Sequence, residues 1–150
     1  MTGPKEQGCV FCAARDAGGA HPLVVWAGTA ALVILNKYPY NNGHLMVVPH
    51  RHLSSLGALT GAELQEVALL TQRAEAVLME GYGPAGINVG INVGKAAGAG
   101  IDDHLHVHLV PRWAGDTNFM TSIGATRVLP EALEDAAVRL RPIFRAVMER

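Results

Sequence analysis

The sequence of 150 residues has few cysteines, few aromatic residues and almost no net charge. Two cysteines, Cys9 and Cys12, are too few for the disulfide framework of a small secreted domain. Twelve Lys and Arg residues balance thirteen Asp and Glu residues, which gives a formal charge of -1. Because no general excess of positive charge exists to bind a phosphate backbone, the composition argues against DNA or RNA as the main partner.

Long apolar runs are missing as well. No run approaches the roughly 18 residues that a membrane-spanning helix needs, and residues 1–7 lack the apolar core of a signal peptide. We therefore expect a cytoplasmic protein with no membrane partner. The length and the 49% of hydrophobic residues predict one globular domain over residues 1–150.

The apolar patterning predicts an α+β fold. Runs of branched apolar residues predict five strands, over 23–26, 30–35, 44–48, 86–93 and 104–110. With one long helix and a C-terminal helix between and after them, these strands are expected to form an antiparallel sheet. Residues 1–22 are expected to be an irregular arm that carries the two cysteines. Residues 121–150 are expected to be a helical extension, which Pro142 kinks or splits.

The long helix is expected to begin at Thr60, because Thr60 and Glu63 have the spacing of a capping box. Gly81 and the pair Gly83-Pro84 mark its end. Its apolar stripe follows helical spacing through Leu64, Val67, Ala68, Ala74, Val77 and Leu78. The C-terminal helix has a second stripe of Leu133, Ala136, Ala137, Leu140, Ile143, Phe144 and Val147.

A row of three histidines is the most informative feature. Strand geometry would place His104, His106 and His108 on one face, with the apolar residues between them facing the core. Three imidazoles in a row can ligate one metal ion. Alternatively, one ring can attack phosphorus while its neighbours bind phosphate.

The loop before the histidines favours phosphate chemistry. Exposed backbone amides in a glycine-rich loop can hold phosphate, and Gly98, Ala99 and Gly100 are the candidates here. A site with three histidine ligands does not require such a loop. Strand alternation on 86–93 places Ile87, Val89, Ile91 and Val93 on one face, and Asn92 on the polar face beside the loop.

The segment His104-Leu-His-Val-His-Leu-Val110 matches the pattern His-φ-His-φ-His-φ-φ of the histidine-triad (HIT) family, where φ is apolar. Gly43-His44-Leu-Met-Val-Val-Pro49 resembles a second block of that family. The segments 35–44 and 111–120 are similar to a bacterial branch that cleaves diadenosine tetraphosphate by hydrolysis or phosphorolysis. The resemblance implies a HIT-like fold and a homodimer.

The resemblance also implies a role for each matching residue. His106 would attack the α-phosphorus of a nucleotide and form a nucleotidyl-histidine, while His108 contacts the phosphate. His44 would support the nucleophile without contacting the substrate and would set the tautomer of its ring. Asn36 would hold the ribose, and Asn92 would reach the phosphate or a bridging oxygen. Mg²⁺ is expected only as a companion of the polyphosphate substrate.

The loop departs from the family in one respect. Many relatives have Ser, Thr or Gln two to four residues before the triad, where the side chain assists the leaving group. This chain has Ala99, Gly100, Ile101, Asp102 and Asp103 in that stretch. Backbone amides are the expected substitute, and the choice between water and inorganic phosphate as acceptor stays open.

The pair Cys9-x-x-Cys12 alone fits half of a zinc site, a redox pair or two buried thiols. Several bacterial proteins of the family, and the related uridylyltransferases, bind structural zinc through such a pair. The resemblance therefore implies zinc ligation by Cys9, Cys12, His52 and His104. His50 is the competitor of His52 for this role.

The leading hypothesis is an enzyme that cleaves dinucleoside polyphosphates. A nucleoside phosphoramidate hydrolase of the same family, a non-catalytic nucleotide-binding module and a metalloenzyme with three histidine ligands are the alternatives. Trp113 and Phe119 either stack on a base or pack the C-terminal segment. The pair Asp102-Asp103 is interpreted as solvated loop charge rather than as a metal site.

Overall fold

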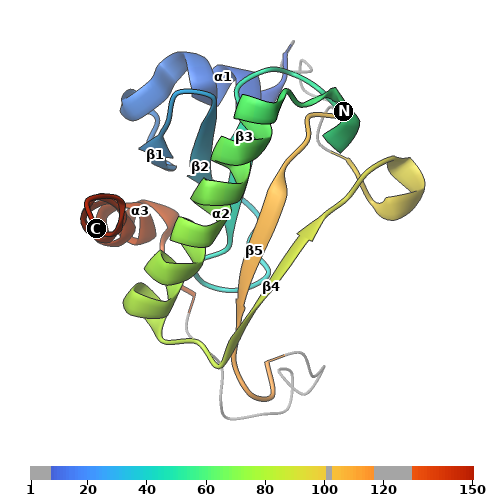
Figure 1. Cartoon of the computed structure of the whole chain (residues 1–150). Coiled ribbons are helices and arrows are strands. Elements are labelled where there is room, and N and C mark those ends of the chain that lie inside the picture. The colour runs from blue at the N-terminus through green and yellow to red at the C-terminus, as the bar shows by residue number, and fades with distance from the viewer. Residues whose placement is uncertain (1–7, 101–102, 117–129) are drawn as a thin grey trace, which may run out of the picture.

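The computed structural model describes residues 8–100, 103–116 and 130–150, and every structural statement below concerns these residues. Five strands form one sheet: β1 (Val24–Ala27), β2 (Ala31–Leu35), β3 (Leu45–Pro49), β4 (Gly86–Ile91) and β5 (Val107–Arg112). Their order is β1-β2-β3-β5-β4, and each neighbouring pair is antiparallel. The predicted α+β fold with a five-stranded antiparallel sheet is confirmed (Figure 1).

Helix α2 (Gly61–Tyr82) lies across the sheet, in front of it in Figure 1. The predicted capping box is present. The Thr60 hydroxyl accepts the Glu63 N–H at 3.2 Å, and the Glu63 carboxylate accepts the Thr60 N–H at 2.9 Å. Gly83 closes the helix with a left-handed φ of 56°. The buried apolar stripe begins at Val67, because Leu64 is exposed, and Ala68 is exposed as well, both contrary to prediction.

Helix α3 (Leu133–Met148) packs beside α2 and β1. Its predicted apolar stripe lies in the core or packs against it. Pro142 does not split this helix. Pro142 has no N–H, so the carbonyl of Val138 lacks its helical hydrogen-bond donor. Both residues are on the exposed side of the helix, where water can hydrate that carbonyl, and the helix continues.

The two faces of the sheet have separate hydrophobic cores. Helices α2 and α3 cover the larger core, which includes Val33, Val47 and Leu109. On the other face, Phe11 and Ala14 of helix α1 (Val10–Ala17) pack against Val24, Leu32, Ile34, Met46 and Val48. The expectation of an irregular arm is therefore wrong for this part of the chain. The cap residue Cys9 makes no side-chain capping bond, so burial of Phe11 and Ala14 stabilises α1.

Strand β5 begins later than predicted. Residues 104–106 lie outside the sheet, and the Leu105 N–H donates to the Leu53 carbonyl at 2.7 Å instead of to a neighbouring strand. Consequently, His108 lies within the strand, while His104 and His106 precede it. The predicted strand ends at residue 110, whereas β5 continues through Pro111 to Arg112.

Strand β4 forms one edge of the sheet. Ile87 and Ile91 pack against the larger core, but Val89 and Val93 are 51% and 46% exposed, so the predicted apolar face is only half covered. Three short 3-10 turns complete the described structure, at Gly18–Ala20, Leu56–Ala58 and Lys95–Ala97. None of the helices in the described ranges is long and apolar enough to cross a membrane.

Candidate functional site

His106 has its tautomer set by the main chain. Its Nδ1 lies 2.8 Å from the carbonyl oxygen of His104. A carbonyl can only accept, so Nδ1 carries the proton and Nε2 keeps a bare lone pair. The aromatic ring of Phe11 lies 5.1 Å from the His106 ring and 5.5 Å from the His104 ring, which holds both imidazoles against α1.

His44 and His108 form a second imidazole pair. The Tyr40 N–H donates to Nδ1 of His44 at 3.2 Å, so the proton of His44 is on Nε2. Nε2 of His44 then donates to Nδ1 of His108 at 2.9 Å. His108 in turn carries its proton on Nε2. The structure thus corrects the expected role of His44, which contacts His108, while the His104 carbonyl sets the tautomer of His106.

Burial keeps these rings uncharged. His44 is fully buried, and burial, reinforced by His108 and His106, lowers its pKa to about 4. Burial also lowers the pKa of His108, with His106 adding to the effect. Near neutral pH, His44 is therefore a neutral donor to His108.

The turn between β2 and β3 positions Asn36 and His44. The side-chain Oδ1 of Asn36 accepts the Tyr38 N–H at 2.8 Å, and the side-chain Nδ2 of Asn36 lies 3.4 Å from Nε2 of His44. Gly43 has a φ of +78°, and a Cβ there would lie 2.7 Å from Cε2 of Tyr82. Only glycine fits this position, immediately before His44.

Two cavities meet at His106. The larger, of about 470 Å³, is the tyrosine cavity, and its lining includes Asn36, Tyr38, Tyr40, Asn88, Gly90, Asn92, Gly98, Gly100, His106 and His108. The smaller, of about 280 Å³, is the lysine cavity, lined in part by Ser54, Ser55, Asn92, Lys95, Ala99, Gly100, Asp103 and His106. The predicted substrate residues therefore gather around the predicted nucleophile.

Two loop amides are not available in the way the sequence suggested. The Gly98 N–H donates to the Lys95 carbonyl at 3.0 Å, and the Ala99 N–H donates to the Gly94 carbonyl at 3.1 Å. Both amides close the turn, so they cannot also cradle phosphate. Gly98 and Ala99 still line the cavities, where they shape the walls.

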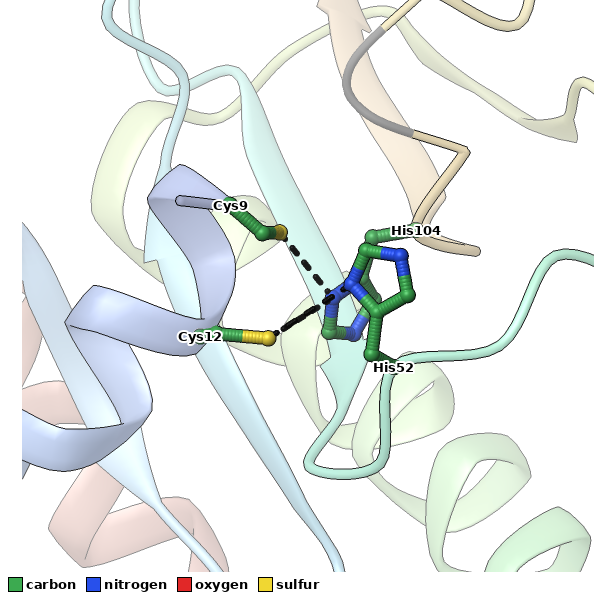
Figure 2. Close-up of side chains that lie close together, drawn as sticks. All are labelled: Cys9, Cys12, His52 and His104. Atoms are coloured by element: carbon green, nitrogen blue, oxygen red, sulfur yellow. Dashed lines mark hydrogen bonds between the residues drawn. The ribbon is translucent and has the colours of Figure 1, made fainter. Parts of the chain in front are cut away.

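The two cysteines face two histidines (Figure 2). Nδ1 of His104 lies 3.2 Å from Sγ of Cys9 and 3.6 Å from Sγ of Cys12, and Nδ1 of His52 lies 3.6 Å from Sγ of Cys12. All four candidate ligand atoms lie within 4.8 Å of one another. Ligands of a tetrahedral zinc ion are about 3.4–3.8 Å apart, given Zn–S and Zn–N bonds of about 2.3 and 2.1 Å. This cluster can hold a metal ion.

The tautomer of His104 suits this role. Its Nε2 donates to the Pro49 carbonyl at 2.8 Å, which leaves the lone pair of Nδ1 for a metal. Among the described residues, the metal cluster takes His104 from the triad and leaves out His106 and His108. The arrangement argues against one ion ligated by all three histidines. It also includes His52 and leaves out the competitor His50.

Other candidates have structural partners. The Trp113 ring makes an edge contact with the Tyr82 ring at 6.5 Å, which supports the packing interpretation. Phe119 and Asp102 lie outside the described residues. The sequence reasoning missed Tyr38 and Tyr40 as cavity residues. Two aromatic residues around a proline in a polar turn were the available signal.

A family model described as the HIT domain matches residues 21–115. The chain belongs to the HIT family. A protein named AP-4-A phosphorylase, from Mycobacterium tuberculosis, is 50% identical over 113 residues, which are 75% of this chain. The match covers 58% of that relative, so the chain spans less than two thirds of its length. A bis(5'-adenosyl)-triphosphatase from Dictyostelium discoideum is 29% identical over 76% of this chain and 80% of its own.

Solved structures of the HIT family have the same fold. A Zn-bound histidine triad family protein from Mycobacterium smegmatis superposes with a TM-score of 0.75 at 29% identity, covering 95% of this chain and 96% of the other. A protein described as a hypothetical histidine triad nucleotide-binding protein, from Sulfolobus tokodaii, superposes with a TM-score of 0.70 at 27% identity, covering 94% of this chain and 92% of the other.

Proposed function

We propose that the protein cleaves dinucleoside polyphosphates such as diadenosine tetraphosphate. The observation that carries the proposal is the hydrogen bond from Nδ1 of His106 to the His104 carbonyl, which leaves Nε2 with its lone pair beside two cavities. A neutral imidazole can approach an anionic phosphate without charge repulsion. The 50% identity to a protein named AP-4-A phosphorylase supports this substrate class.

The chemistry takes two steps. In the first, Nε2 of His106 attacks the α-phosphorus, a P–N bond forms, and the P–O bond to the leaving nucleoside polyphosphate breaks. In the second, an acceptor oxygen attacks the same phosphorus and the P–N bond breaks, which restores the neutral ring. The Nε2–H of His108 donates to a phosphate oxygen, because its Nδ1 is occupied by His44. Asn36 holds the ribose, Asn92 binds phosphate, and Mg²⁺ accompanies the polyphosphate as part of the substrate.

Trapping the covalent intermediate tests this proposal. The protein is mixed with diadenosine tetraphosphate, quenched within milliseconds to seconds, and analysed by intact mass and peptide mapping. We expect one nucleotidyl group on His106, and none in His106→Ala. The matched control is His21→Ala, because His21 lies in the loop before β1, where it accepts the Leu23 N–H. Intact ligand bound at stoichiometry without an adduct would instead favour a nucleotide-binding module.

The acceptor decides the type of reaction. The relative named a phosphorylase favours inorganic phosphate, while the relative named a triphosphatase favours water. We propose phosphorolysis, because the first relative is the more similar in sequence. Products distinguish the two: ATP plus ADP in the presence of phosphate indicates phosphorolysis, and ATP plus AMP indicates hydrolysis at the α-phosphorus. A panel with nucleoside phosphoramidates tests the same-family alternative.

We propose that the cluster of Cys9, Cys12, His52 and His104 binds a structural zinc ion. Two sulfur and two nitrogen ligands are a typical closed zinc site. The Zn-bound Mycobacterium smegmatis structure supports the choice of metal. When bound, zinc would supply a cross-link between α1 and the segment before β5. Such a site requires reduced thiols, which fits the cytoplasmic location that the sequence predicts.

We also propose a homodimer. Strand β4 is an edge strand, and its exposed Val89 and the exposed Val93 just beyond its end can be covered by a second copy. Light scattering after size exclusion tests the assembly. We expect a dimer for the unmodified protein, and a smaller species for Val89→Lys.

A further inference from the structure

The two cysteines of the metal cluster are the only cysteines in the chain, and both lie at the start of helix α1 (Figure 2). Cys9 is the cap residue, and its carbonyl accepts the Ala13 N–H at 3.0 Å, as in the first turn of a helix. Cys12 follows three positions later, so the two Cα atoms are about 5 Å apart. Disulfides span Cα distances of about 4.4–6.8 Å. The two sulfur atoms lie within 4.8 Å of each other, so side-chain rotation can join them without unwinding the helix.

Both thiols lie where a small molecule can reach them. Cys9 and Cys12 are each only partly buried. Other side chains anchor the helix, because Phe11 and Ala14 are 2% and 0% exposed and pack against the sheet. A bond between the two cysteines would therefore change the metal cluster and leave the packing of α1 intact.

His104 connects the thiols with the proposed nucleophile. Its Nδ1 lies 3.2 Å from Sγ of Cys9, and its main-chain carbonyl accepts the Nδ1–H of His106 at 2.8 Å. Residues 104–106 lie outside the sheet, so the hydrogen bonds of a strand do not hold this carbonyl in place. Its position depends instead on local contacts, including those of the His104 ring with the two cysteines.

We infer that Cys9 and Cys12 are a reversible oxidation site for hydroperoxides, and that their disulfide empties the metal cluster and releases the alignment of His106. The inference rests on the proposed zinc site, and it adds to the proposed reaction a dependence on oxidation. Disulfides of cytosolic proteins are mostly transient and often sense the redox state, which fits the expected location. Two accessible thiols next to each other are the arrangement that such sensing requires.

The oxidation takes two steps and consumes one hydrogen peroxide. One thiolate attacks an oxygen of the peroxide, the O–O bond breaks, hydroxide leaves, and the sulfur becomes a sulfenic acid. The other thiolate attacks that sulfur, the S–S bond forms, and the S–O bond breaks with loss of a second hydroxide. Two electrons pass from the sulfurs to the peroxide, and solvent protons convert both hydroxides to water. The cluster then lacks both sulfur ligands, and His52 and His104 alone do not retain a structural zinc ion.

Mass and metal measurements on the full chain test the oxidation site. The zinc-loaded protein is treated with hydrogen peroxide, and the released zinc is measured with a chromophoric chelator. The tryptic peptide of residues 6–15 contains both cysteines and no methionine, so methionine oxidation does not alter its mass. We expect this peptide to lose about 2 Da, the two hydrogens of one disulfide, as about one zinc ion per chain is released. Dithiothreitol and added zinc should reverse both changes.

Two histidine variants separate the thiols from the metal. His52→Ala keeps both cysteines but lacks one proposed ligand, so it should form the same disulfide with no zinc to release. His50→Ala keeps all four candidate ligands, because His50 lies outside the cluster, and should behave as the unmodified protein does.

NMR of ¹⁵N-labelled histidines tests the effect on His106 and requires no nucleotide. The nitrogen shifts of a neutral imidazole report which nitrogen carries the proton, and His106→Ala assigns the ring. We expect the Nδ1–H tautomer alone in the reduced protein, and a mixture of both tautomers after oxidation, because the His104 carbonyl is then displaced. Dithiothreitol and added zinc should restore the single tautomer.

Each outcome supports or overturns a stated part of the inference. A gain of about 16 or 32 Da on the peptide, or a disulfide between two chains, overturns the oxidation site. Zinc retained by the disulfide form overturns the release of metal, and a reduced protein that binds no zinc refutes the zinc site and the release together. An unchanged tautomer after zinc release overturns the link to His106. None of these results depends on nucleotidylation, so a failure of the proposed reaction remains distinguishable.

Discussion

Nε2 of His44 donates to Nδ1 of His108 across 2.9 Å, and this bond fixes the tautomer of His108, which lines the tyrosine cavity. His44 is therefore a positioning residue that acts through His108. His106 is oriented in a similar way, because its Nδ1 donates to the main-chain carbonyl of His104. Each of the two rings proposed to act on phosphate is thus aligned by a partner behind it.

Replacing His44 should reduce turnover through His108. His44→Ala removes the donor, and we expect kcat to fall about 10- to 100-fold, the usual effect of losing such a supporting hydrogen bond. His44→Gln keeps an N–H donor and should recover a large part of this loss. Steady-state kinetics with diadenosine tetraphosphate measure both variants. Equal defects in the two variants would contradict the positioning role, because only the glutamine can donate to Nδ1 of His108.

Burial of His44 makes stability depend on pH. The unfolded chain takes up a proton at the ordinary pKa of 6.5, whereas folded His44 does so only at about 4. The stability from neutral His44 is therefore complete above pH 6.5 and is lost as the pH falls toward 4. Between pH 7.5 and 4.5 this residue should cost about 2 to 3 kcal/mol of unfolding free energy.

Urea denaturation of the unmodified protein and of His44→Gln at the two pH values isolates this contribution. Glutamine does not titrate, so the stability advantage of histidine should shrink by that amount at pH 4.5. Buried histidines out of contact with His44, such as His104, change the stability of both proteins alike, and the comparison cancels them. The remaining difference belongs to His44 together with its partner His108. A constant difference between the two proteins at both pH values would show that folding does not lower the pKa of His44.

The metal cluster includes His52 but not the nearby His50. His52→Ala and Cys12→Ser each remove a proposed zinc ligand, so both variants should lose zinc measured by elemental analysis. Their unfolding temperature should fall by several degrees, because each ~1 kcal/mol lost shifts it by about 2–4 °C in a chain of this size. His50→Ala is the matched control, since Nε2 of His50 has no hydrogen-bond partner in the described structure. Zinc retained by His52→Ala and lost by His50→Ala would reverse the assignment.

Gly43 should not tolerate a side chain. Gly43→Ala combines a φ of +78° with a Cβ only 2.7 Å from the Tyr82 ring, so we expect a loss of about 1–3 kcal/mol of unfolding free energy. Gly57→Ala is the control, because a Cβ at Gly57 meets nothing within 4 Å and its φ is not left-handed. Similar stabilities of the two variants, measured by chemical denaturation, would show that the turn before His44 can rearrange.

Local chemistry explains which parts of the fold could be predicted. The Thr60–Glu63 capping box and the apolar stripe of the C-terminal helix depend on residues close in sequence, and both were predicted correctly. Helix α1 was missed because it has only eight residues and no side-chain cap. Its stability comes from contacts of Phe11 with the distant sheet, which no local pattern reveals.

The candidate site shows the same division. Alternation and the HIT motif indicated His106 and His108, and the cluster of Cys9, Cys12, His52 and His104 was also predicted. The bond partner of His44 could not be predicted, because it depends on the register of β3 against β5, where Met46 lies opposite His108. The hydrogen bonds inside the loop at Gly98 and Ala99 depend on a 3-10 turn that the composition did not indicate.

His104 serves two neighbours at once, since its ring faces the thiols while its main-chain oxygen orients His106. A mutation in the N-terminal helix would consequently present as a catalytic defect in a genetic screen. Substitutions of Cys9 would reduce activity as substitutions in the active site do, although Cys9 lies 95 residues before His104, the residue whose imidazole it contacts.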